Sequence, residues 1–390
     1  MEYIERDLTN IFEKLINTYK IIAVVGARQA GKTTFLKNKI KKYKSSYILF
    51  DDPDAKEIFE EDIKKFKIQY LQSYEISILD EIQNCKQAGQ KLKYLADTGE
   101  KLWITSSSEI VLSKEILSYL VGRVAILKLY PFSLNEFLKA KNQKIITQQI
   151  LSRSIWEHAT YGGYPQVIIN EDIEVKKTIL KNIYETMILK DIRKTWNIDD
   201  LPKLEKLVKY LALNNGEICE YQNISNKLNI SYQTLIKYLD ALEKSYLIIK
   251  LSPYFTNKTK EITKQPKIYF LDTGLRNVIA KTDEFDGYIF ENYILTELIK
   301  LNKDVKYWRN KTGQEVDFII ESKKGLIAIE VKQTETEISK SLKRFIDEYK
   351  PYKTMIVCYK EQKKIKKYKN NLVLLTNTLD LIKEIKKINF

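Results

Sequence analysis

One segment, residues 26–34, constrains the fold of this chain more than any other. It matches the pattern GxxxxGK[S/T], in which a glycine-rich turn ends in a lysine and a hydroxyl residue. The segment 21–25 before it is short, apolar and rich in branched residues, which is typical of a buried strand. The segment 34–42 after it favours a helix. Strand, loop and helix therefore follow in the order that a phosphate-binding loop requires, which disfavours a chance match in a glycine turn.

The residue types in this loop suit the binding of a nucleotide. Glycines let successive backbone N–H groups curl around a phosphate at a helix N-terminus. Lys32 would neutralise the β- and γ-phosphates of ATP, and the Thr33 hydroxyl would ligate Mg²⁺. We therefore expect ATP and Mg²⁺ as cofactors, held by a loop that consists of Gly26, Ala27, Arg28, Gln29, Ala30, Gly31, Lys32, Thr33 and Thr34.

A second apolar strand, 76–79, ends in two adjacent carboxylates. We expect Asp80 to hold the Mg²⁺ ion and Glu81 to polarise the attacking water, although a solvated strand end would look the same in isolation. Further strands are expected at 47–50 and 102–105, separated from the others by helix-length segments. This alternation predicts a parallel α/β sheet, and with the loop it predicts an N-terminal P-loop ATPase core.

The remainder of the chain predicts three further domains. A helical region interrupted by Tyr-Gly-Gly-Tyr-Pro is interpreted as a lid or linker, because two glycines and a proline preclude a continuous helix. Three short helices and two β-like segments, with a lysine-rich stretch between the latter, favour a winged helix-turn-helix. Strands and helices then alternate again. The predicted domains are the ATPase core at 1–131, the helical lid at 132–200, the winged helix at 201–275 and a second α/β domain at 276–390.

Six short motifs occur together along the chain: VVGARQAGKTT, ISILDEIQ, ITSSSE, LVGR, LYPFSLNEF and YGGYP. Together they resemble a widespread archaeal and bacterial family of AAA-type ATPases with a nuclease-like C-terminal region. The resemblance covers nearly the whole chain and implies a sensor of the γ-phosphate at Ser107 and an arginine finger at Arg123. A serine-rich turn and a capping or salt-bridge arginine are the alternatives. We interpret the last two motifs as lid-packing and hinge elements.

The C-terminal domain carries three acidic residues and a lysine on one expected helix and two expected strands. Glu291 lies on an expected helix and Asp317 on an expected strand. Glu330 and Lys332 share one face of the next strand, because strand side chains alternate. This order resembles the PD-(D/E)xK nuclease superfamily, with Val316 in place of its proline, and implies a restriction-endonuclease-like domain. Its catalytic residues would be Glu291, Asp317, Glu330 and Lys332, with a metal ion on the three acids. A nuclease-like fold kept for docking, with these charges in salt bridges, is the alternative.

The charge balance indicates a polyanionic partner. Lysine and arginine number 66 against 51 acidic residues, a net charge of +15. We expect DNA contacts from the third short helix and from Lys258, Lys260 and Lys264 in the wing, although winged helices also dock proteins. A single histidine excludes histidine-rich metal sites, and three separated cysteines predict no disulfide framework. The chain lacks a long apolar run, so we expect no membrane association and a cytoplasmic location.

The sequence thus predicts an AAA-type ATPase that binds and hydrolyses ATP, and that binds and processes DNA through a metal-dependent nuclease-like domain. A homo-oligomer is one assembly that would suit an arginine finger. The alternative is an ATPase switch whose inactive nuclease-like domain binds a partner or DNA. A small-molecule kinase is disfavoured, because it would leave the C-terminal half of the chain without a role.

Overall fold

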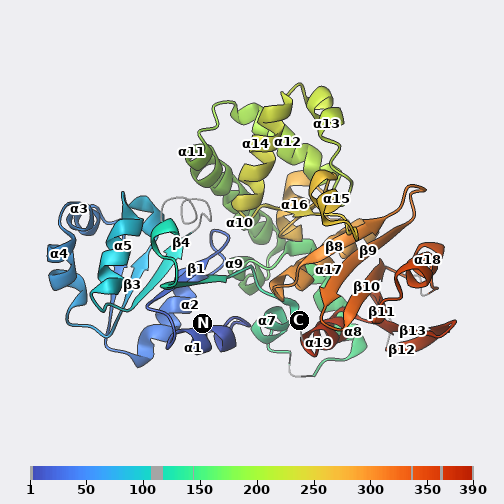
Figure 1. Ribbon diagram of the computed structural model, residues 1–390, viewed down its shortest axis with the longest axis horizontal. Coiled ribbons are helices and arrows are strands. Elements are labelled where there is room, and N and C mark those ends of the chain that lie inside the picture. Colours follow the sequence, from blue (N-terminus) through green and yellow to red (C-terminus); the bar gives the residue numbers. More distant parts are fainter. Residues whose placement is uncertain (1–2, 107–116, 144, 335–336, 361–362, 389–390) are drawn as a thin grey trace. The chain divides into compact units, whose positions relative to one another are not determined.

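The computed structural model describes residues 3–106, 117–143, 145–334, 337–360 and 363–388 (Figure 1). It divides into two compact units, and each is described by itself. The first unit contains residues 1–132, 182–199 and 244–246, and the second contains residues 133–181, 200–243 and 247–390. Within the described parts of the chain, no helix combines the length and the apolar character needed to cross a membrane.

The first unit is built on a five-stranded parallel sheet in the order β2-β3-β4-β1-β5. This confirms the predicted parallel α/β core. Since β4 lies between β1 and β3, the carboxyl ends of these three strands meet at one edge of the sheet. The strands are β1 (Ile21–Val25), β2 (Ser45–Leu49), β3 (Ile76–Asp80), β4 (Leu102–Ser106) and β5 (Val124–Lys128).

Helices pack on this sheet around an aromatic cluster. Phe12 contacts Phe35 and Trp103 edge to face, with ring centroids 5.0 and 4.8 Å apart. The first helix of the unit begins at Thr9, and the chain before it is held by hydrogen bonds from Arg6. The helices of this unit are α1 (Thr9–Leu15), α2 (Lys32–Lys39), η1 (Ile40–Lys42), α3 (Pro53–Glu61), α4 (Ile63–Phe66), η2 (Lys67–Leu71), η3 (Ile82–Asn84), α5 (Ala88–Asp97), η5 (Leu117–Tyr119), η6 (Met187–Ile192) and α11 (Arg193–Trp196).

The second unit contains a six-stranded mixed sheet in the order β12-β13-β11-β10-β9-β8 (Figure 1). Strands β8, β9 and β10 are antiparallel neighbours, whereas β10, β11 and β13 run parallel. The strands are β8 (Val305–Arg309), β9 (Glu315–Ser322), β10 (Gly325–Lys332), β11 (Lys353–Cys358), β12 (Lys364–Tyr368) and β13 (Asn371–Thr376). Helices α17 (Gly287–Lys300) and α19 (Thr378–Lys386) pack with one apolar core of this sheet, and α18 (Lys340–Tyr349) packs with another.

The lysine-rich run 363–369 contains strand β12. It pairs with β13 at the edge of the sheet. Lysines suit such an edge, because their charge discourages pairing with another chain.

The remaining elements of the second unit follow in the predicted order, with three helices before an antiparallel pair of strands. A short helix, α15, replaces the irregular lysine-rich stretch expected between the two strands. These elements are α7 (Leu134–Ala140), α8 (Gln148–Tyr161), α9 (Pro165–Ile169), α10 (Ile173–Thr186), α12 (Leu201–Leu213), α13 (Tyr221–Leu228), α14 (Tyr232–Lys244), β6 (Ile248–Leu251), α15 (Lys258–Thr263), β7 (Lys267–Phe270) and α16 (Thr273–Ala280).

The lid, winged-helix and C-terminal segments that the sequence predicts share one buried apolar cluster. Leu134 and Ile155 of the helical segment pack in the same buried cluster as Tyr269 of β7 and Phe290 of α17. One apolar core therefore joins three of the four predicted domains.

The Tyr-Gly-Gly-Tyr-Pro motif at 161–165 packs against the N-terminus of α16. Gly163 N donates a hydrogen bond to Asp272 Oδ2 (2.7 Å), and Leu275 N donates to Asp272 Oδ1 (3.0 Å). Burial raises the pKa of the Asp272 carboxyl. Gly162 has a φ of +80°, and a Cβ on it would lie 2.1 Å from Asp272 Oδ1. The motif therefore needs glycine for both conformation and space.

We predict that Gly162→Ala lowers the free energy of unfolding by about 2 to 4 kcal/mol, because it combines a left-handed backbone with a clash against a buried carboxylate. Chemical denaturation measures this value. Gly287→Ala is the matched control, since no atom lies within 4 Å of a Cβ at Gly287 and its φ is not in the left-handed region. Equal stability of the two variants would contradict this explanation of the motif.

Candidate functional site

The loop between β1 and α2 has the backbone of a phosphate cradle. Gly31 caps α2 in the left-handed conformation, with φ +95°. A Cβ on Gly26 would lie 2.0 Å from Leu129 O, so the close approach of the loop to this backbone requires glycine. Gln29 also has a positive φ, +59°. The loop thus leads directly into the N-terminus of α2, where unpaired backbone N–H groups attract an anion.

Lys32 lies inside this loop. Its Nζ donates hydrogen bonds to Gly26 O (2.9 Å) and Ala27 O (3.0 Å), and the residue is buried. The ammonium is therefore placed beside the backbone groups that would surround a phosphate. Thr34, the last predicted loop residue, lies in the first turn of α2.

Sequence reasoning missed Arg6, which fixes the loop from outside. Its guanidinium donates to Ala30 O (2.9 Å) and to Tyr130 O (2.6 Å). These bonds tie the loop to the chain that follows β5. No motif signals this role, because Arg6 is far from both carbonyls in the sequence.

Asp80, the last residue of β3, is the centre of a hydrogen-bond network that joins β2, β4 and α2. Its buried carboxylate accepts bonds from Thr33 Oγ1 (3.0 and 2.9 Å), from the Tyr47 hydroxyl (2.6 Å) and from the Thr105 hydroxyl. Burial and the bond to Asp80 raise the pKa of Tyr47, so its hydroxyl remains a donor. Thr33 and Asp80, the two predicted Mg²⁺ ligands, are thus in contact, and hydroxyl and carboxylate oxygens are ligands that Mg²⁺ prefers.

Glu81 follows Asp80 in a left-handed conformation, with φ +57°. Its backbone N donates to Thr105 Oγ1 (2.9 Å), and its carboxylate accepts a bond from Gln83 Nε2. Non-glycine residues in this conformation are strained and cluster at functional sites. Thr105 therefore orients both acids, a contribution that sequence reasoning did not assign to it. The predicted sensor, Ser107, lies outside the described residues.

Arg123 lies at the opposite end of the sheet from the loop. Its carbonyl accepts a bond from Ile21 N, and the parallel register pairs Ile21 with Val124 and Val25 with Lys128. Four residues of strand separate the two ends, roughly 13 Å. The guanidinium forms an ion pair with Asp97, with Nε 2.6 Å from Oδ1. The salt bridge that the sequence left as an alternative is thus present, and Arg123 cannot reach the loop of its own chain.

The parallel sheet, the glycine loop and the Thr33–Asp80 contact define an AAA-type P-loop ATPase, and comparison with known proteins agrees. Residues 18–138 match the AAA domain family, while 152–286 and 286–378 match two domains of unknown function, DUF8612 and DUF4143. The chain belongs to the same family as uncharacterized protein MJ1544 of Methanocaldococcus jannaschii. The two are 30% identical over 350 residues, which cover 84% of this chain and 78% of that protein.

Two further similarities are weaker. An uncharacterized protein of Haemophilus influenzae is 31% identical over 235 residues, 58% of each chain. Among solved structures, the Walker-type ATPase PABY2304 of Pyrococcus abyssi has a TM-score of 0.49 at 15% identity, covering 71% of this chain and 96% of that one.

A second group of charged residues lies on β9 and β10 of the other unit. These strands are antiparallel, with Ile329 opposite Phe318, so Glu330 and Asp317 are neighbours across them. Val331 N donates to Asp317 Oδ2 (2.6 Å), and Lys332 Nζ lies 3.0 Å from Glu330 Oε1. Burial and the nearby carboxylate of Glu291 raise the pKa of Asp317 well above its ordinary value. The pairing of the two strands therefore brings Asp317 and Glu330 together.

Glu330 carries a buried oxygen that lacks a partner. The residue is 3% exposed, and no described residue forms a hydrogen bond with its Oε2. An unpaired charged oxygen in such a place is costly, and a bound cation would relieve the cost. Asp317 and Glu330 therefore fit a divalent cation.

Glu291 does not complete the predicted set of three acidic ligands. Its carboxylate accepts a bond from the Tyr269 hydroxyl and lies 3.4 Å from Lys267 Nζ, which also pairs with Glu315. Among the described residues, no group of three or more His, Cys, Asp or Glu is arranged to hold a metal ion. The basic and phenolic groups of β7 thus hold Glu291, and sequence reasoning did not foresee either of them.

Proposed function

We propose that this ATPase uses ATP turnover to act on DNA, and that its C-terminal carboxylates bind a divalent cation and cleave the phosphodiester backbone. The observation that carries the nuclease part is the buried, unpartnered Oε2 of Glu330 beside Asp317 and Lys332. The test is cleavage of duplex, single-stranded and branched DNA with Mg²⁺ or Mn²⁺.

In the ATPase core we assign each role from the contacts above. Lys32 moves its ammonium from the Gly26 and Ala27 carbonyls to the β- and γ-phosphates, a short movement because all of these groups belong to one loop. Thr33 and Asp80 would hold a Mg²⁺ ion together, and Glu81 would orient the attacking water. The strain and bonding at Glu81 fix the direction of its carboxylate before the nucleotide arrives.

Arg123 acts on the nucleotide of a neighbouring copy in this proposal, which makes the active ATPase a homo-oligomer. We predict that Arg123→Ala lowers ATP turnover by at least about 100-fold with little change in nucleotide affinity, because a finger contacts only the developing charge. Wild-type specific activity should rise with protein concentration.

Asp97→Asn is the matched control for the finger. This substitution removes the charge of Asp97 and so breaks its ion pair with Arg123, but it keeps the Arg123 guanidinium. If the pair were merely structural, the two variants would lose the same activity. Near-normal turnover in Arg123→Ala would refute the finger.

At the C-terminal site, Asp317 and Glu330 would hold the cation, which when bound supplies Lewis-acid polarisation of a phosphate oxygen. The Glu330 carboxylate and the nearby Asp317 raise the pKa of Lys332, although burial opposes this, so the ammonium stays charged beside the site. Lys332 can therefore stabilise negative charge on a phosphate or orient water.

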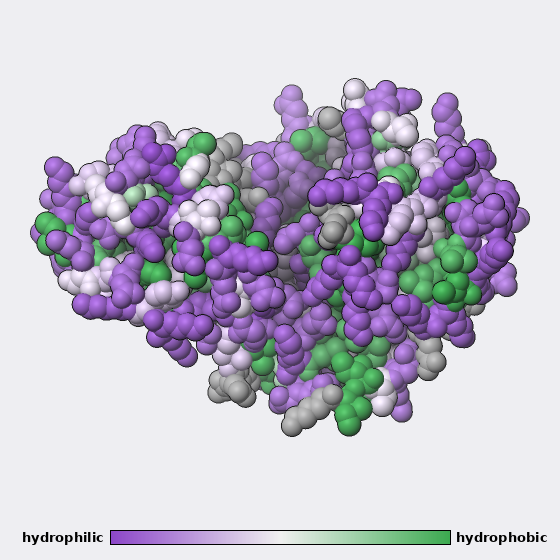
Figure 2. All heavy atoms as spheres, turned by 60° about the horizontal axis from the view of Figure 1, so that its bottom comes forward, coloured by the Kyte–Doolittle hydropathy of each residue, from purple (hydrophilic) through white to green (hydrophobic). Residues whose placement is uncertain are grey.

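Charge supports DNA as the polymer. The net charge is +15, and hydrophilic side chains cover most of the face shown in Figure 2. Of the three lysines predicted for the wing, Lys258 is engaged by Glu261 and Glu321. Lys260 and Lys264 remain the candidates for phosphate contacts.

An ATPase switch with an inactive C-terminal domain is the second candidate, and one observation favours it. Lys267 and Tyr269 hold Glu291, so the described residues assemble two carboxylates and not three. In that case the domain binds DNA or a partner without cutting.

A further inference from the structure

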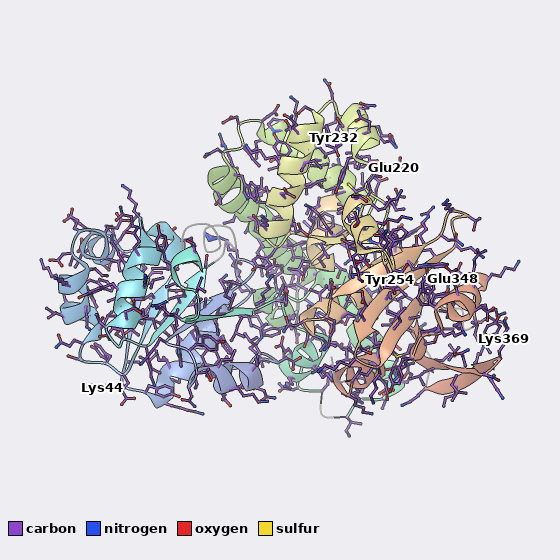
Figure 3. The ribbon with its side chains drawn as sticks, in the orientation of Figure 1. Lys44, Glu220, Tyr232, Tyr254, Glu348 and Lys369 are labelled. Atoms are coloured by element: carbon purple, nitrogen blue, oxygen red, sulfur yellow. The ribbon has the colours of Figure 1, made fainter. Side chains whose placement is uncertain are left out.

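A cavity of about 600 Å³ lies in the second unit, apart from Asp317 and Glu330. Its walls come from five places: the segment before α13, the segment after β6, the helix α15 with the residues that follow it, the end of β8 with the following turn, and the end of α18. Figure 3 labels Glu220 and Glu348, which line the cavity from the first and the last of these. Segments far apart in the sequence thus build one concave site.

Two half-buried aromatic residues, Phe255 and Tyr349, line this cavity. Tyr307 and Trp308 also contribute to its wall, but their rings are buried in the two cores of the sheet, with 3% of each residue exposed. Tyr307 Oη donates to Gln265 O (3.0 Å), and Trp308 Nε1 donates to Tyr349 Oη (3.3 Å). The polar atoms of Tyr307 and Trp308 are therefore satisfied, and the bond from Trp308 fixes the Tyr349 ring, which lines the cavity.

The rim carries more positive than negative charge. Lys260, Lys264 and Lys311 are exposed, and the described part of the chain places no carboxylate within ion-pair distance of their Nζ atoms. The two acids of the rim have other partners, since Glu348 lies 4.0 Å from Arg344 and Glu220 accepts from Asn223. An anion at this rim would meet three cations that are not otherwise engaged.

A chain of contacts leads from the cavity to the carboxylates. Arg309 lines the cavity and lies 3.5 Å from Glu315, which pairs with Lys267, which in turn lies 3.4 Å from Glu291. These contacts alternate in charge and Lys267 is buried, so they connect the wall of the cavity to Glu291 through the interior of the protein.

We propose that this cavity binds an unpaired nucleotide of a DNA strand, with the base against Phe255 and Tyr349 and the phosphates on Lys260, Lys264 and Lys311. The choice of DNA rests on the proposed function. Cationic grooves with aromatic platforms are how proteins hold single strands without sequence preference. A volume of this size is that of a small-molecule site, which admits a nucleotide and excludes a base-paired duplex.

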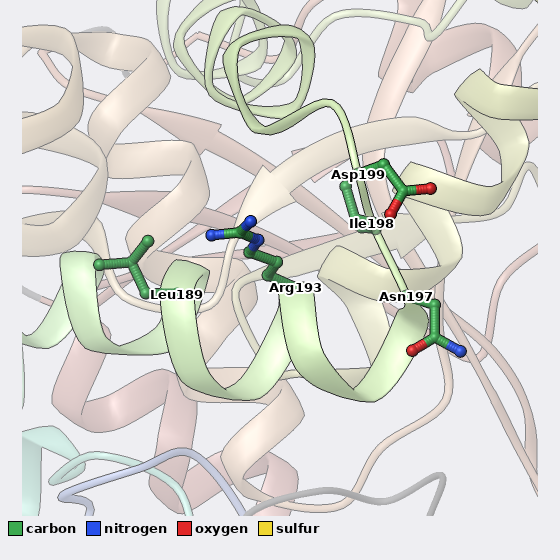
Figure 4. Close-up of a pocket in the computed structure, with 5 residues that line it drawn as sticks. All are labelled: Leu189, Arg193, Asn197, Ile198 and Asp199. Atoms are coloured by element: carbon green, nitrogen blue, oxygen red, sulfur yellow. The ribbon is translucent and has the colours of Figure 1, made fainter.

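A cavity of about 500 Å³ in the first unit is a poorer fit. It is lined by Leu189, Arg193, Asn197, Ile198 and Asp199 (Figure 4). One continuous segment supplies this lining, which holds a single cation, a carboxylate and no aromatic ring.

Binding of a fluorescently labelled oligothymidylate to the full chain in EDTA tests the proposal without any cleavage. The triple variant Lys260→Ala, Lys264→Ala, Lys311→Ala should flatten the dependence of log affinity on log salt by about two units, since each single-strand phosphate contact contributes roughly 0.7. ATP turnover and thermal unfolding should stay as in the wild type.

A second triple variant, Lys41→Ala, Lys42→Ala, Lys44→Ala, removes the same charge from exposed positions in the first unit (Lys44 is labelled in Figure 3). It should leave the salt slope unchanged. Equal slopes for the two triples would overturn the proposal, because net charge alone would then explain binding.

The base is tested separately with an abasic strand of the same length. Stacking of one base is worth about 1 to 3 kcal/mol, so the abasic strand should bind at least about five-fold more weakly. Equal affinity of the two strands, or tighter binding of duplex than of single strand, would overturn the base-in-cavity arrangement.

The outcomes also separate this inference from the proposed nuclease. Loss of binding in the cavity variant of a protein that never cuts DNA upholds the cavity and removes the nuclease. Normal DNA binding and DNA cleavage by the same variant would overturn the cavity proposal and support the nuclease.

Discussion

Replacing Lys32 with alanine is expected to abolish ATP turnover. The ammonium is the cation that the structure places within the phosphate loop, where it bridges the Gly26 and Ala27 carbonyls. Its loss leaves the β- and γ-phosphates without their main positive partner and leaves the two carbonyls facing an anion. We expect turnover to fall more than about 10³-fold, measured as phosphate release, together with weaker nucleotide binding.

Two further variants make this result specific. Lys39→Ala removes a lysine from the same helix, where its Nζ pairs with Glu5 at 2.6 Å, and should keep most of the activity. Glu81→Gln should retain nucleotide binding but stop hydrolysis, since it keeps the shape of the side chain and removes the charge that polarises water. Near-normal turnover in Lys32→Ala would refute the assignment of the loop.

The nucleotide site was largely predictable because its parts are local in sequence. A glycine pattern fixes the loop, and the carboxyl ends of parallel strands must meet at one edge, so Thr33 and Asp80 could be paired in advance. The roles of Arg6 and Tyr47 could not be predicted, because they depend on long-range packing. Each contributes a single bonded group to the site, and no spacing rule announces either one.

The carboxylate site was predictable only in part. Alternation along a strand was enough to place Glu330 and Lys332 on one face, and the antiparallel pairing of β9 and β10 brings Asp317 beside Glu330. The partners of Glu291 come from β7, which the sequence assigned to a different domain. One core joins these segments. Lys267 and Tyr269, from the predicted winged helix, therefore reach Glu291, from the predicted nuclease-like domain.

Asp317→Asn and Glu330→Gln are each expected to abolish metal-dependent DNA cleavage while DNA binding persists. Both substitutions keep the side-chain shape, so the loss would report the missing charge that holds the cation. We expect cleavage of single-stranded, duplex and branched DNA to fall more than about 10³-fold, with ATP turnover unchanged. Glu321→Gln is the matched control, because Glu321 lies on the same strand as Asp317 but pairs with Lys258 and Lys306.

Cation binding gives this prediction a readout that does not depend on cutting. Mn²⁺ titrated into nucleotide-free protein should bind the wild type and Glu321→Gln, and should bind Glu330→Gln much more weakly, since the buried Oε2 is then part of a neutral amide. A wild type that binds Mn²⁺ but never cuts any of the three DNA forms would select the ATPase switch over the nuclease. Cleavage that survives both Asp317→Asn and Glu330→Gln would place the activity outside this site altogether.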